Sequence, residues 1–198
     1  SGDWVFAQAT QQLRVWRDSW APQLQISVNL SPVQLHASPG RLNWRQHLQS
    51  AGLKGSAVAV EITEGLLLDK SAGVTNELLA FRDAGVQVAI DDFGTGYSAM
   101  AYLTQMDIDY LKIDQSFVRN LDHEGGDHAL CEAMVVMAHK LGLKVIAEGV
   151  ETTQQRDLLA AMGCDYVQGY LYGRPLPVEA FGQLLQHQLE PVDDAAPA

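Results

Sequence analysis

Short apolar runs alternate with longer amphipathic stretches along the chain. Six such runs predict strands, at residues 25–30, 57–63, 86–93, 110–114, 144–150 and 166–170. Stretches of helical period predict an opening helix around residues 4–7 and further helices at residues 41–51, 72–84, 97–106, 127–141, 153–162 and 178–187. This order is typical of repeated β/α units that build a mainly parallel sheet.

Every predicted strand ends in a side chain that can bind a metal ion or a phosphate. In chain order these are Asn29, Glu61, Asp91 with Asp92, Lys112 with Asp114, Glu148 and Gln168. In a (β/α) barrel the C-terminal ends of all parallel strands meet at one face, whereas a doubly wound sheet brings only the strands beside its crevice to the ligand. The pattern therefore predicts an α/β fold, a TIM-type (β/α) barrel. Because such a barrel has eight strands, we expect this one to be incomplete at its N-terminus.

Length and composition fit one ordinary globular domain. The 198 residues are 47% hydrophobic and 19% charged, and no low-complexity linker divides them. We expect one domain over residues 1–189 and a disordered tail over residues 190–198. Cys131 and Cys164 lack CxxC spacing, which argues against a disulfide framework or a zinc site.

The net charge of −11 argues against DNA or RNA as a partner, because binding to a phosphate backbone needs a concentrated basic patch. A small anionic ligand can still bind where metal ions supply positive charge. No apolar run approaches the ~20 residues of a membrane-spanning helix, so we expect no membrane contact by this segment. We expect a cytoplasmic location, while a longer protein that contains the chain can be anchored to a membrane elsewhere.

The strand-end acids and one amide offer hard oxygen ligands, which suit Mg²⁺ or Mn²⁺ better than zinc. The candidate metal ligands are Asn29, Glu61, Asp91, Asp92 and Glu148. Neighbouring strand residues face opposite ways, so Asp91 and Asp92 reach one site only if the strand breaks between them. The turn Gly94-Thr95-Gly96 permits such a break.

Two divalent ions bridged by a carboxylate would activate a water molecule and clamp the attacking and leaving oxygens of a phosphodiester. Lys112 can hold that water or offset charge in the transition state. Any single acid of the set has a simpler explanation as a helix N-cap or a surface ion pair. That explanation is weaker for acids in register on successive strands, which favour the metal site.

The segment from Gly94 to Ala99 also fits a dinucleotide-binding loop, since Gly94-x-Gly96-x-x-Ala99 has its spacing. Asp114 follows Gly94 by 20 positions, near where such a fold places the acid that binds ribose. Two carboxylates directly before the loop would repel a pyrophosphate, however, so this alternative is the weaker one.

Longer motifs match one protein family. They are Val28-Asn29-Leu30-Ser31 with Gln34, Glu61-Ile62-Thr63-Glu64, Asp91-Asp92-Phe93-Gly94-Thr95-Gly96-Tyr97-Ser98, Leu111-Lys112-Ile113-Asp114, Ala147-Glu148-Gly149-Val150-Glu151-Thr152, and Gln168-Gly169-Tyr170 with Pro175. In these motifs and in their order the chain resembles the EAL domain of bacterial cyclic di-GMP phosphodiesterases. The resemblance runs from about residue 4 to residue 187.

The resemblance implies a hydrolase that uses two Mg²⁺ or Mn²⁺ ions to open cyclic di-GMP to the linear dinucleotide pGpG, which removes a bacterial second messenger. The implied metal ligands are Asn29, Glu61, Asp91 and Asp92, with Glu148 close to the second ion.

Further roles follow from the same resemblance. Lys112 would contact the catalytic water or the scissile phosphate, and Glu148 and Gln168 would belong to the same catalytic group. Glu64 would brace the loop after Asp92. The remaining residues expected to support the site or bind substrate are Asp114, Glu151 and Pro175.

The Glu-Ala-Leu segment that names the family lies on its first strand and is absent from these 198 residues. Its glutamate is a metal ligand in the family, so we expect little or no hydrolysis by this chain alone. Two hypotheses remain: a phosphodiesterase whose catalytic domain includes this chain, or a non-catalytic module that binds cyclic di-GMP or a protein partner. The resemblance also leaves a homodimer open and implies sensory or GGDEF domains in the same protein.

Overall fold

The computed structural model of the chain describes residues 2–37, 44–69, 71–96, 103–104, 106–121 and 125–189. Within these ranges six strands form one sheet: β1 (Ile26–Asn29), β2 (Val58–Thr63), β3 (Gln87–Phe93), β4 (Tyr110–Ile113), β5 (Lys144–Ala147) and β6 (Tyr166–Val167). Every neighbouring pair is parallel, and the strands lie in the sheet in sequence order. A barrel needs this order, whereas a doubly wound sheet reverses it at a switch point. The fold is therefore the predicted TIM-type barrel in part, a six-stranded arc of it.

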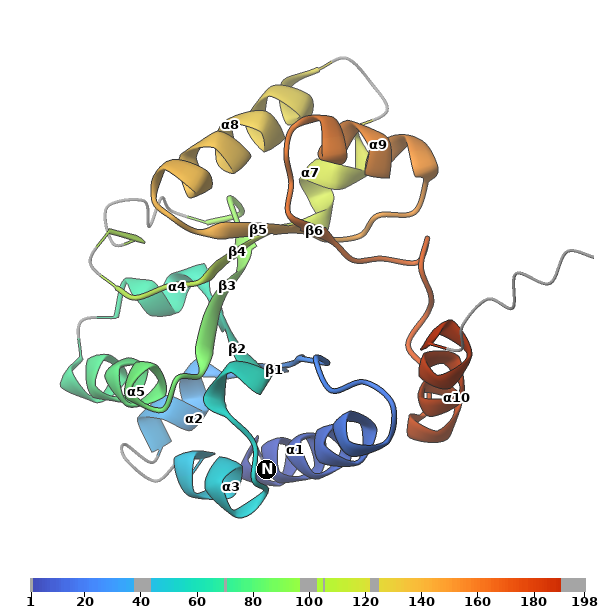
Figure 1. Cartoon of the computed structure of the whole chain (residues 1–198). Coiled ribbons are helices and arrows are strands. Elements are labelled where there is room, and N and C mark those ends of the chain that lie inside the picture. Colours follow the sequence, from blue (N-terminus) through green and yellow to red (C-terminus); the bar gives the residue numbers. More distant parts are fainter. Residues whose placement is uncertain are drawn as a thin grey trace, which may run out of the picture.

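Helices follow the strands and lie on the outer side of this arc, as Figure 1 shows. They are α1 (Gly2–Ser19), α2 (Pro32–Ala37), α3 (Trp44–Ser50), the 3-10 turn η1 (Gly55–Ala57), α4 (Glu64–Leu67), α5 (Ala72–Asp83), α7 (Gln115–Arg119), α8 (Gly126–Lys140), α9 (Thr153–Ala161) and α10 (Val178–Leu189). The long helices agree with the amphipathic pattern, but the short helices α2, α4 and α7 were not predicted. The helix predicted at 97–106 and the tail predicted at 190–198 lie outside, or almost wholly outside, the described residues.

The two faces of the sheet differ in character. Even-numbered residues of β2, and of β3 as far as Ile90, are buried and form the core beneath the helices; they include Val60, Ile62 and Ile90. Odd-numbered residues of β2, and of β3 as far as Asp91, point to the inner face of the arc, because successive strand residues face opposite ways; they include Glu61 and Asp91. The alternation therefore sends the candidate acids to the inner face of the arc and the aliphatic side chains to the core.

The first and last helices of the described chain pack together. Trp16 of α1 lies against Phe181 of α10, with ring centroids 4.9 Å apart, and in Figure 1 the two helices lie beside each other. A stack of Phe6 on Trp44, 4.0 Å between centroids, fixes α1 to α3. Aromatic pairs of this kind add to the free energy of burial.

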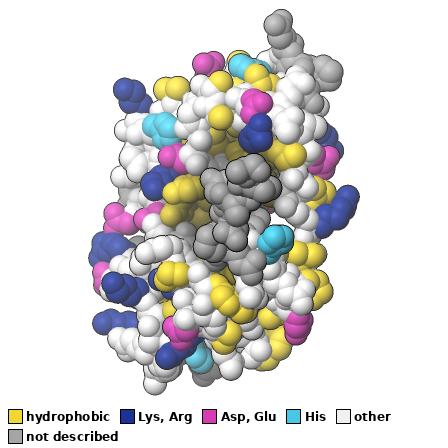
Figure 2. Space-filling view, turned by 45° about the vertical axis from the view of Figure 1, so that its right-hand side comes forward, with side chains coloured by type: hydrophobic (Ala, Val, Ile, Leu, Met, Phe, Trp, Pro, Cys, Tyr) yellow, Lys and Arg dark blue, Asp and Glu magenta, His cyan; other side chains and the backbone are white. Residues whose placement is uncertain are grey.

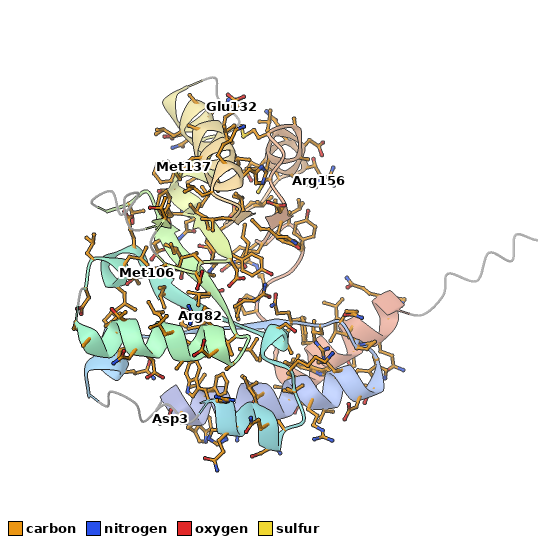
Figure 3. The ribbon with its side chains drawn as sticks, turned by 60° about the vertical axis from the view of Figure 1, so that its left-hand side comes forward. Asp3, Arg82, Met106, Glu132, Met137 and Arg156 are labelled. Atoms are coloured by element: carbon orange, nitrogen blue, oxygen red, sulfur yellow. The ribbon has the colours of Figure 1, made fainter. Side chains whose placement is uncertain are left out.

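Ion pairs on the outer surface join helices to the segments before the strands. Arg82 of α5, labelled in Figure 3, bonds Asp107 ahead of β4 at 3.2 Å. Figure 3 also shows α8 and α9, marked by Glu132 and Arg156, side by side at one end of the molecule. Among the described residues no helix is both long and apolar enough to cross a bilayer.

At the end of the sheet opposite the candidate site, β4 and β6 are each preceded by an aspartate. Asp109, before β4, accepts a hydrogen bond from the backbone N–H of Val88 at 2.8 Å. Asp165, before β6, does the same for the N–H of Val145 at 2.8 Å. Each acid thus ties the start of its own strand to the start of the preceding one.

Candidate metal centre and active site

Lys112 of β4 lies at the centre of the candidate site. Its ammonium bonds three carboxylates from three other strands or strand ends: Glu61 Oε2 at 2.8 Å, Asp91 Oδ1 at 2.8 Å and Glu148 Oε1 at 2.7 Å. The Lys112 side chain is 3% exposed, so these bonds form away from bulk water. The structure therefore brings together four residues that the sequence placed at four separate strand ends.

A second grouping overlaps the first. Carboxylate oxygens of Asp91, Asp92 and Glu148 all lie within 4.8 Å of one another, close enough to hold a metal ion. Two oxygens on one Mg²⁺ are at most about 4.2 Å apart, and on one Ca²⁺ about 5 Å, so small side-chain movements would close the cluster on either ion. Hard oxygen donors at this spacing fit a divalent cation of the Mg²⁺, Mn²⁺ or Ca²⁺ type.

Asp91 and Asp92 reach the same site because the strand breaks between Ile90 and Phe93, where the pairing of β3 with β4 shifts register. Asp92 has φ 53°, which turns the backbone so that its side chain joins that of Asp91 and Phe93 returns to the core. Aspartate tolerates this left-handed conformation better than most residues. The break expected between Asp91 and Asp92 is therefore present, and it falls at Asp92, directly before the glycine turn.

Burial and neighbouring charges shift the pKa values of two acids of the cluster, Asp92 and Glu148. The pKa of Asp92 is raised above its ordinary value by burial and by the negative charge of Asp91. The pKa of Glu148 is also raised, by burial and by Asp91 and Glu61, against the opposing effect of Lys112. Burial is the largest cause in both acids, and the neighbouring carboxylates add to it, so a bound cation would relieve both effects.

Lys112 stays charged in this setting. Burial alone would lower its pKa, but the hydrogen bonds to Asp91, Glu148 and Glu61 outweigh burial and raise the pKa above its ordinary value. Lys112 is therefore an ammonium cation at neutral pH, not a proton acceptor.

Glu148 and Gln168 lie just beyond the ends of β5 and β6, strands that are shorter than predicted. Gln168 Nε2 donates to Glu148 Oε1 at 2.5 Å, so the amide orients the carboxylate that also binds Lys112. Gly149 follows with φ 70° and Gly169 with φ 157°, and these turns end the strands.

Asn29 ends β1 directly opposite Glu61 in the parallel register. Its side chain is exposed and lines a hollow of about 400 Å³ with residues of α1 and Gln34. The register thus extends the row of candidate ligands by one strand, with Asn29 at its edge.

The residues expected to support the site occupy different places. Asp114 caps the start of α7 and accepts from the backbone N–H of Ser116 at 2.9 Å, and its pKa is lowered because hydrogen bonds from the Ser116 side chain and from the backbone N–H groups of Ser116 and Gln115 outweigh burial. Glu151 and Pro175 line an open pocket of about 430 Å³, and the same pocket includes Glu148 and Gln168. Glu151 and Pro175 therefore share this pocket with one acid of the site, Glu148.

Gln155 was not singled out in the sequence, although Thr152-x-x-Gln155 is a capping-box pattern. Its side chain is buried, and its Oε1 accepts from the N–H groups of Glu151 at 2.8 Å and Thr152 at 3.0 Å. Its Nε2 donates to Val118 O at 3.2 Å. Gln155 therefore anchors the segment that follows Glu148 to α7.

Acidic and basic side chains are mixed on the molecular surface. On the face that Figure 2 shows, several Lys and Arg side chains lie near one another along the left edge, with acidic side chains between them. Concentrated charge is found instead at the acids around Lys112.

These observations define the class of protein: a (β/α)-barrel domain with an acidic, lysine-centred site at the C-terminal ends of its strands. The chain belongs to the EAL domain family, whose family model matches residues 2–175. The family assignment made from the motifs is thus confirmed.

Two curated relatives come from Pseudomonas aeruginosa. The bifunctional diguanylate cyclase/cyclic di-GMP phosphodiesterase MucR is 39% identical over 181 residues, 90% of this chain and 26% of the relative. The cyclic di-GMP phosphodiesterase NbdA is 39% identical over 184 residues, 93% of this chain and 24% of the relative. The chain therefore spans about a quarter of the length of these proteins.

Solved structures share the fold. A MucR phosphodiesterase in complex with c-di-GMP matches with a TM-score of 0.84 at 37% identity, covering 91% of this chain and 73% of that one. The EAL domain of Mycobacterium smegmatis DcpA matches with a TM-score of 0.87 at 34% identity, covering 96% and 86%. A manganese and c-di-GMP complex of Klebsiella pneumoniae BlrP1 matches with a TM-score of 0.76 at 34% identity, covering 85% and 43%.

Proposed function

We propose that this chain forms part of a cyclic di-GMP phosphodiesterase domain that hydrolyses its substrate to linear pGpG with the help of divalent metal ions. The observation that carries the proposal is the cluster of Asp91, Asp92 and Glu148 beside a buried Lys112, in an EAL domain. The names of the relatives MucR and NbdA support the same substrate.

The proposed metal ligands are Asn29, Glu61, Asp91, Asp92 and Glu148, and we propose Mg²⁺ or Mn²⁺ at two sites. The oxygen donors support these ions, as does the manganese complex of BlrP1. When bound, such ions supply positive charge at the phosphate and make a water molecule more acidic. The residues present fit that requirement, since they offer negative oxygens and no softer donor in the cluster of described side chains.

Around the scissile phosphate, three residues have proposed catalytic roles. Lys112 contributes fixed positive charge that can stabilise a phosphorane-like transition state or hold the attacking water. Glu148 accepts a proton from that water, a role helped by its raised pKa. Gln168 keeps the Glu148 carboxylate in one orientation through its 2.5 Å hydrogen bond.

The proposed supporting residues act on the loops. Glu64 holds the turn after Asp92, and Asp114 fixes the start of α7 next to Asp92. Glu151 and Pro175 line the open pocket beside Glu148, where part of the substrate would lie. The expected cytoplasmic location agrees with two cysteines that are both free.

The test is hydrolysis of cyclic di-GMP by the complete protein with Mg²⁺ or Mn²⁺, compared with Asp91→Asn. We expect pGpG from the wild type and a loss of about 10²-fold or more in the variant, because its charge at the metal is removed. Gln154→Ala, an exposed change on α9, serves as the folded control. Turnover unchanged in Asp91→Asn would overturn the proposal.

Binding of cyclic di-GMP without any turnover, in both the complete protein and the chain alone, would favour the non-catalytic module instead. The chain alone is expected to hydrolyse little, because the Glu-Ala-Leu glutamate is absent from it. We also propose a sensory or GGDEF domain in the complete protein, which the bifunctional name of MucR supports. A homodimer is a further part of the proposal. Sedimentation of the complete protein tests the dimer.

A further inference from the structure

All three N–H bonds of the Lys112 ammonium are used on carboxylates. They go to one oxygen each of Glu61, Asp91 and Glu148, at 2.8, 2.8 and 2.7 Å. The side chain is 3% exposed, so water does little to screen these contacts. A single positive charge thus faces three carboxylates that come from β2, β3 and the end of β5.

Two of these three carboxylates are also candidate metal ligands of the described cluster. Asp91 and Glu148 also belong to the cluster that can hold a divalent ion together with Asp92. Lys112 bonds Oδ1 of Asp91 and Oε1 of Glu148, and each carboxylate has a second oxygen that can accept from or bind a further cation. The ammonium and a metal ion therefore draw on the same two acids from neighbouring positions.

We infer that Lys112 is the resident counter-ion of the acidic cluster, which holds the carboxylates together without metal and weakens the binding of a divalent cation to them. This deepens the proposed function and rests on its metal site, but it does not depend on hydrolysis. A buried acid group without a counter-charge is strongly unfavourable, so some cation has to remain among these acids in the folded state. A cation already in the site repels a second one, which lowers metal affinity.

Two consequences distinguish this role from packing. Removal of the ammonium leaves three carboxylates in mutual repulsion, so the metal-free protein loses stability. The same removal makes the site more negative, so it binds divalent cations more tightly and gains more stability from them. A lysine that only filled space would show the first effect without the second.

The experiment compares Lys112→Met with Lys144→Met in the full chain. Both changes remove one positive charge from the inner face of the sheet, but Lys144 is exposed and donates to the hydroxyl of Tyr166 at 3.2 Å instead of to the acids. Thermal unfolding is followed by circular dichroism in EDTA and in Mg²⁺, and Mn²⁺ binding is measured by isothermal titration. Neither readout uses cyclic di-GMP, so the result is independent of whether the protein is a phosphodiesterase.

In EDTA we expect Lys112→Met to unfold about 6–20 °C below the wild type. Mg²⁺ should recover much of that loss, and Mn²⁺ should bind at least about tenfold more tightly than to the wild type. Lys144→Met should match the wild type in both measurements. Equal stability of Lys112→Met and the wild type in EDTA, or equal Mn²⁺ affinity, would overturn the inference.

A double variant, Lys112→Met with Glu61→Gln, keeps the test decisive if the single variant does not fold. It removes one negative charge from the set that Lys112 had compensated while Asp91, Asp92 and Glu148 are retained. If repulsion causes the loss, the double variant folds in EDTA and unfolds at a higher temperature than Lys112→Met. If lost packing causes it, the double variant is no more stable, and the inference fails.

Discussion

Glu64 and Gly94 are joined by a hydrogen bond in which the backbone N–H of Gly94 donates to Glu64 Oε2 at 3.3 Å. Glu64 begins the short helix α4 after β2, and Gly94 follows β3, so the bond couples the C-terminal ends of two neighbouring strands. A Cβ atom on Gly96 would lie 3.3 Å from the same carboxylate oxygen. The carboxylate thus lies against the turn that comes directly after Asp92.

Replacing Glu64 should loosen this turn and displace Asp92. We expect Glu64→Ala to weaken Mn²⁺ binding by about 10- to 100-fold, the range seen when groups behind metal ligands are removed. Glu64→Gln keeps an oxygen acceptor for Gly94 and should retain most of the affinity. Isothermal titration with Mn²⁺ measures both variants. Full affinity in Glu64→Ala would show that the turn does not need this carboxylate.

Asp92 combines a left-handed backbone with a raised pKa, and two substitutions separate these features. Asp92→Asn keeps a side chain that tolerates φ 53° and removes a charge that burial and Asp91 oppose. It should therefore unfold in EDTA at the same temperature as the wild type or higher, while its Mn²⁺ affinity falls. Asp92→Val should lose about 1–2 kcal/mol of stability, because a β-branched residue is strained at this φ.

Thermal unfolding of the two Asp92 variants in EDTA and Mn²⁺ titration of Asp92→Asn provide the measurements. A metal-free Asp92→Asn that is clearly less stable than the wild type would mean that the Asp92 carboxylate stabilises the fold without metal. The raised pKa predicts the opposite sign.

Much of the arrangement follows from alternation in the sequence. Val60 and Glu61 are neighbours in a run whose even positions are aliphatic, so one face had to be core and the other had to carry Glu61. The order of polar strand ends then implied a shared edge. What alternation leaves open is register, because contacts of Lys112 with acids on three other segments depend on how each strand is staggered against the next.

Short helices were harder to predict from the sequence. The helices α4 and α7 have four and five residues, too few for a hydrophobic period to be visible. The break in β3 was expected between Asp91 and Asp92 and is present there, but only the structure shows that Asp92 itself takes the left-handed φ and that Phe93 returns to the core. The domain boundary at residue 189 and the roles of the site residues stay predictions.

Asp165 gives the fold a pH dependence away from the metal site. Its pKa is lowered, because bonds from His139 at 2.8 Å and from the backbone N–H of Val145 at 2.8 Å outweigh its burial. The unfolded chain therefore takes up this proton at a higher pH than the folded chain does. The stabilisation is fully present above the ordinary value of 3.8 and is lost as the pH falls below it.

Asp165→Asn keeps an oxygen for Val145 but loses the charge. We expect about 1 kcal/mol less stability at neutral pH and a shallower fall in stability between about pH 5 and pH 3. Urea unfolding across this pH range measures both. Asp157→Asn, an exposed acid on α9 paired with Arg156, should keep the slope of the wild type. The same slope in Asp165→Asn would contradict the assignment.

Gln155 ties the segment after Glu148 to the rest of the barrel through three hydrogen bonds, two accepted from Glu151 and Thr152 and one donated to Val118 O. Gln155→Ala leaves these buried or half-buried backbone groups without their partner, which should cost about 1–3 kcal/mol of stability. Because the freed segment begins at Glu151, three residues after Glu148, the orientation of Glu148 should also broaden. We therefore expect hydrolysis of cyclic di-GMP by the complete protein to fall at least about tenfold, with the larger effect on kcat, since a misplaced proton acceptor affects the chemical step more than binding.

Urea unfolding and steady-state kinetics provide the two measurements, with the exposed neighbour Gln154→Ala as the control. Lost stability with unchanged kcat would limit Gln155 to a structural role.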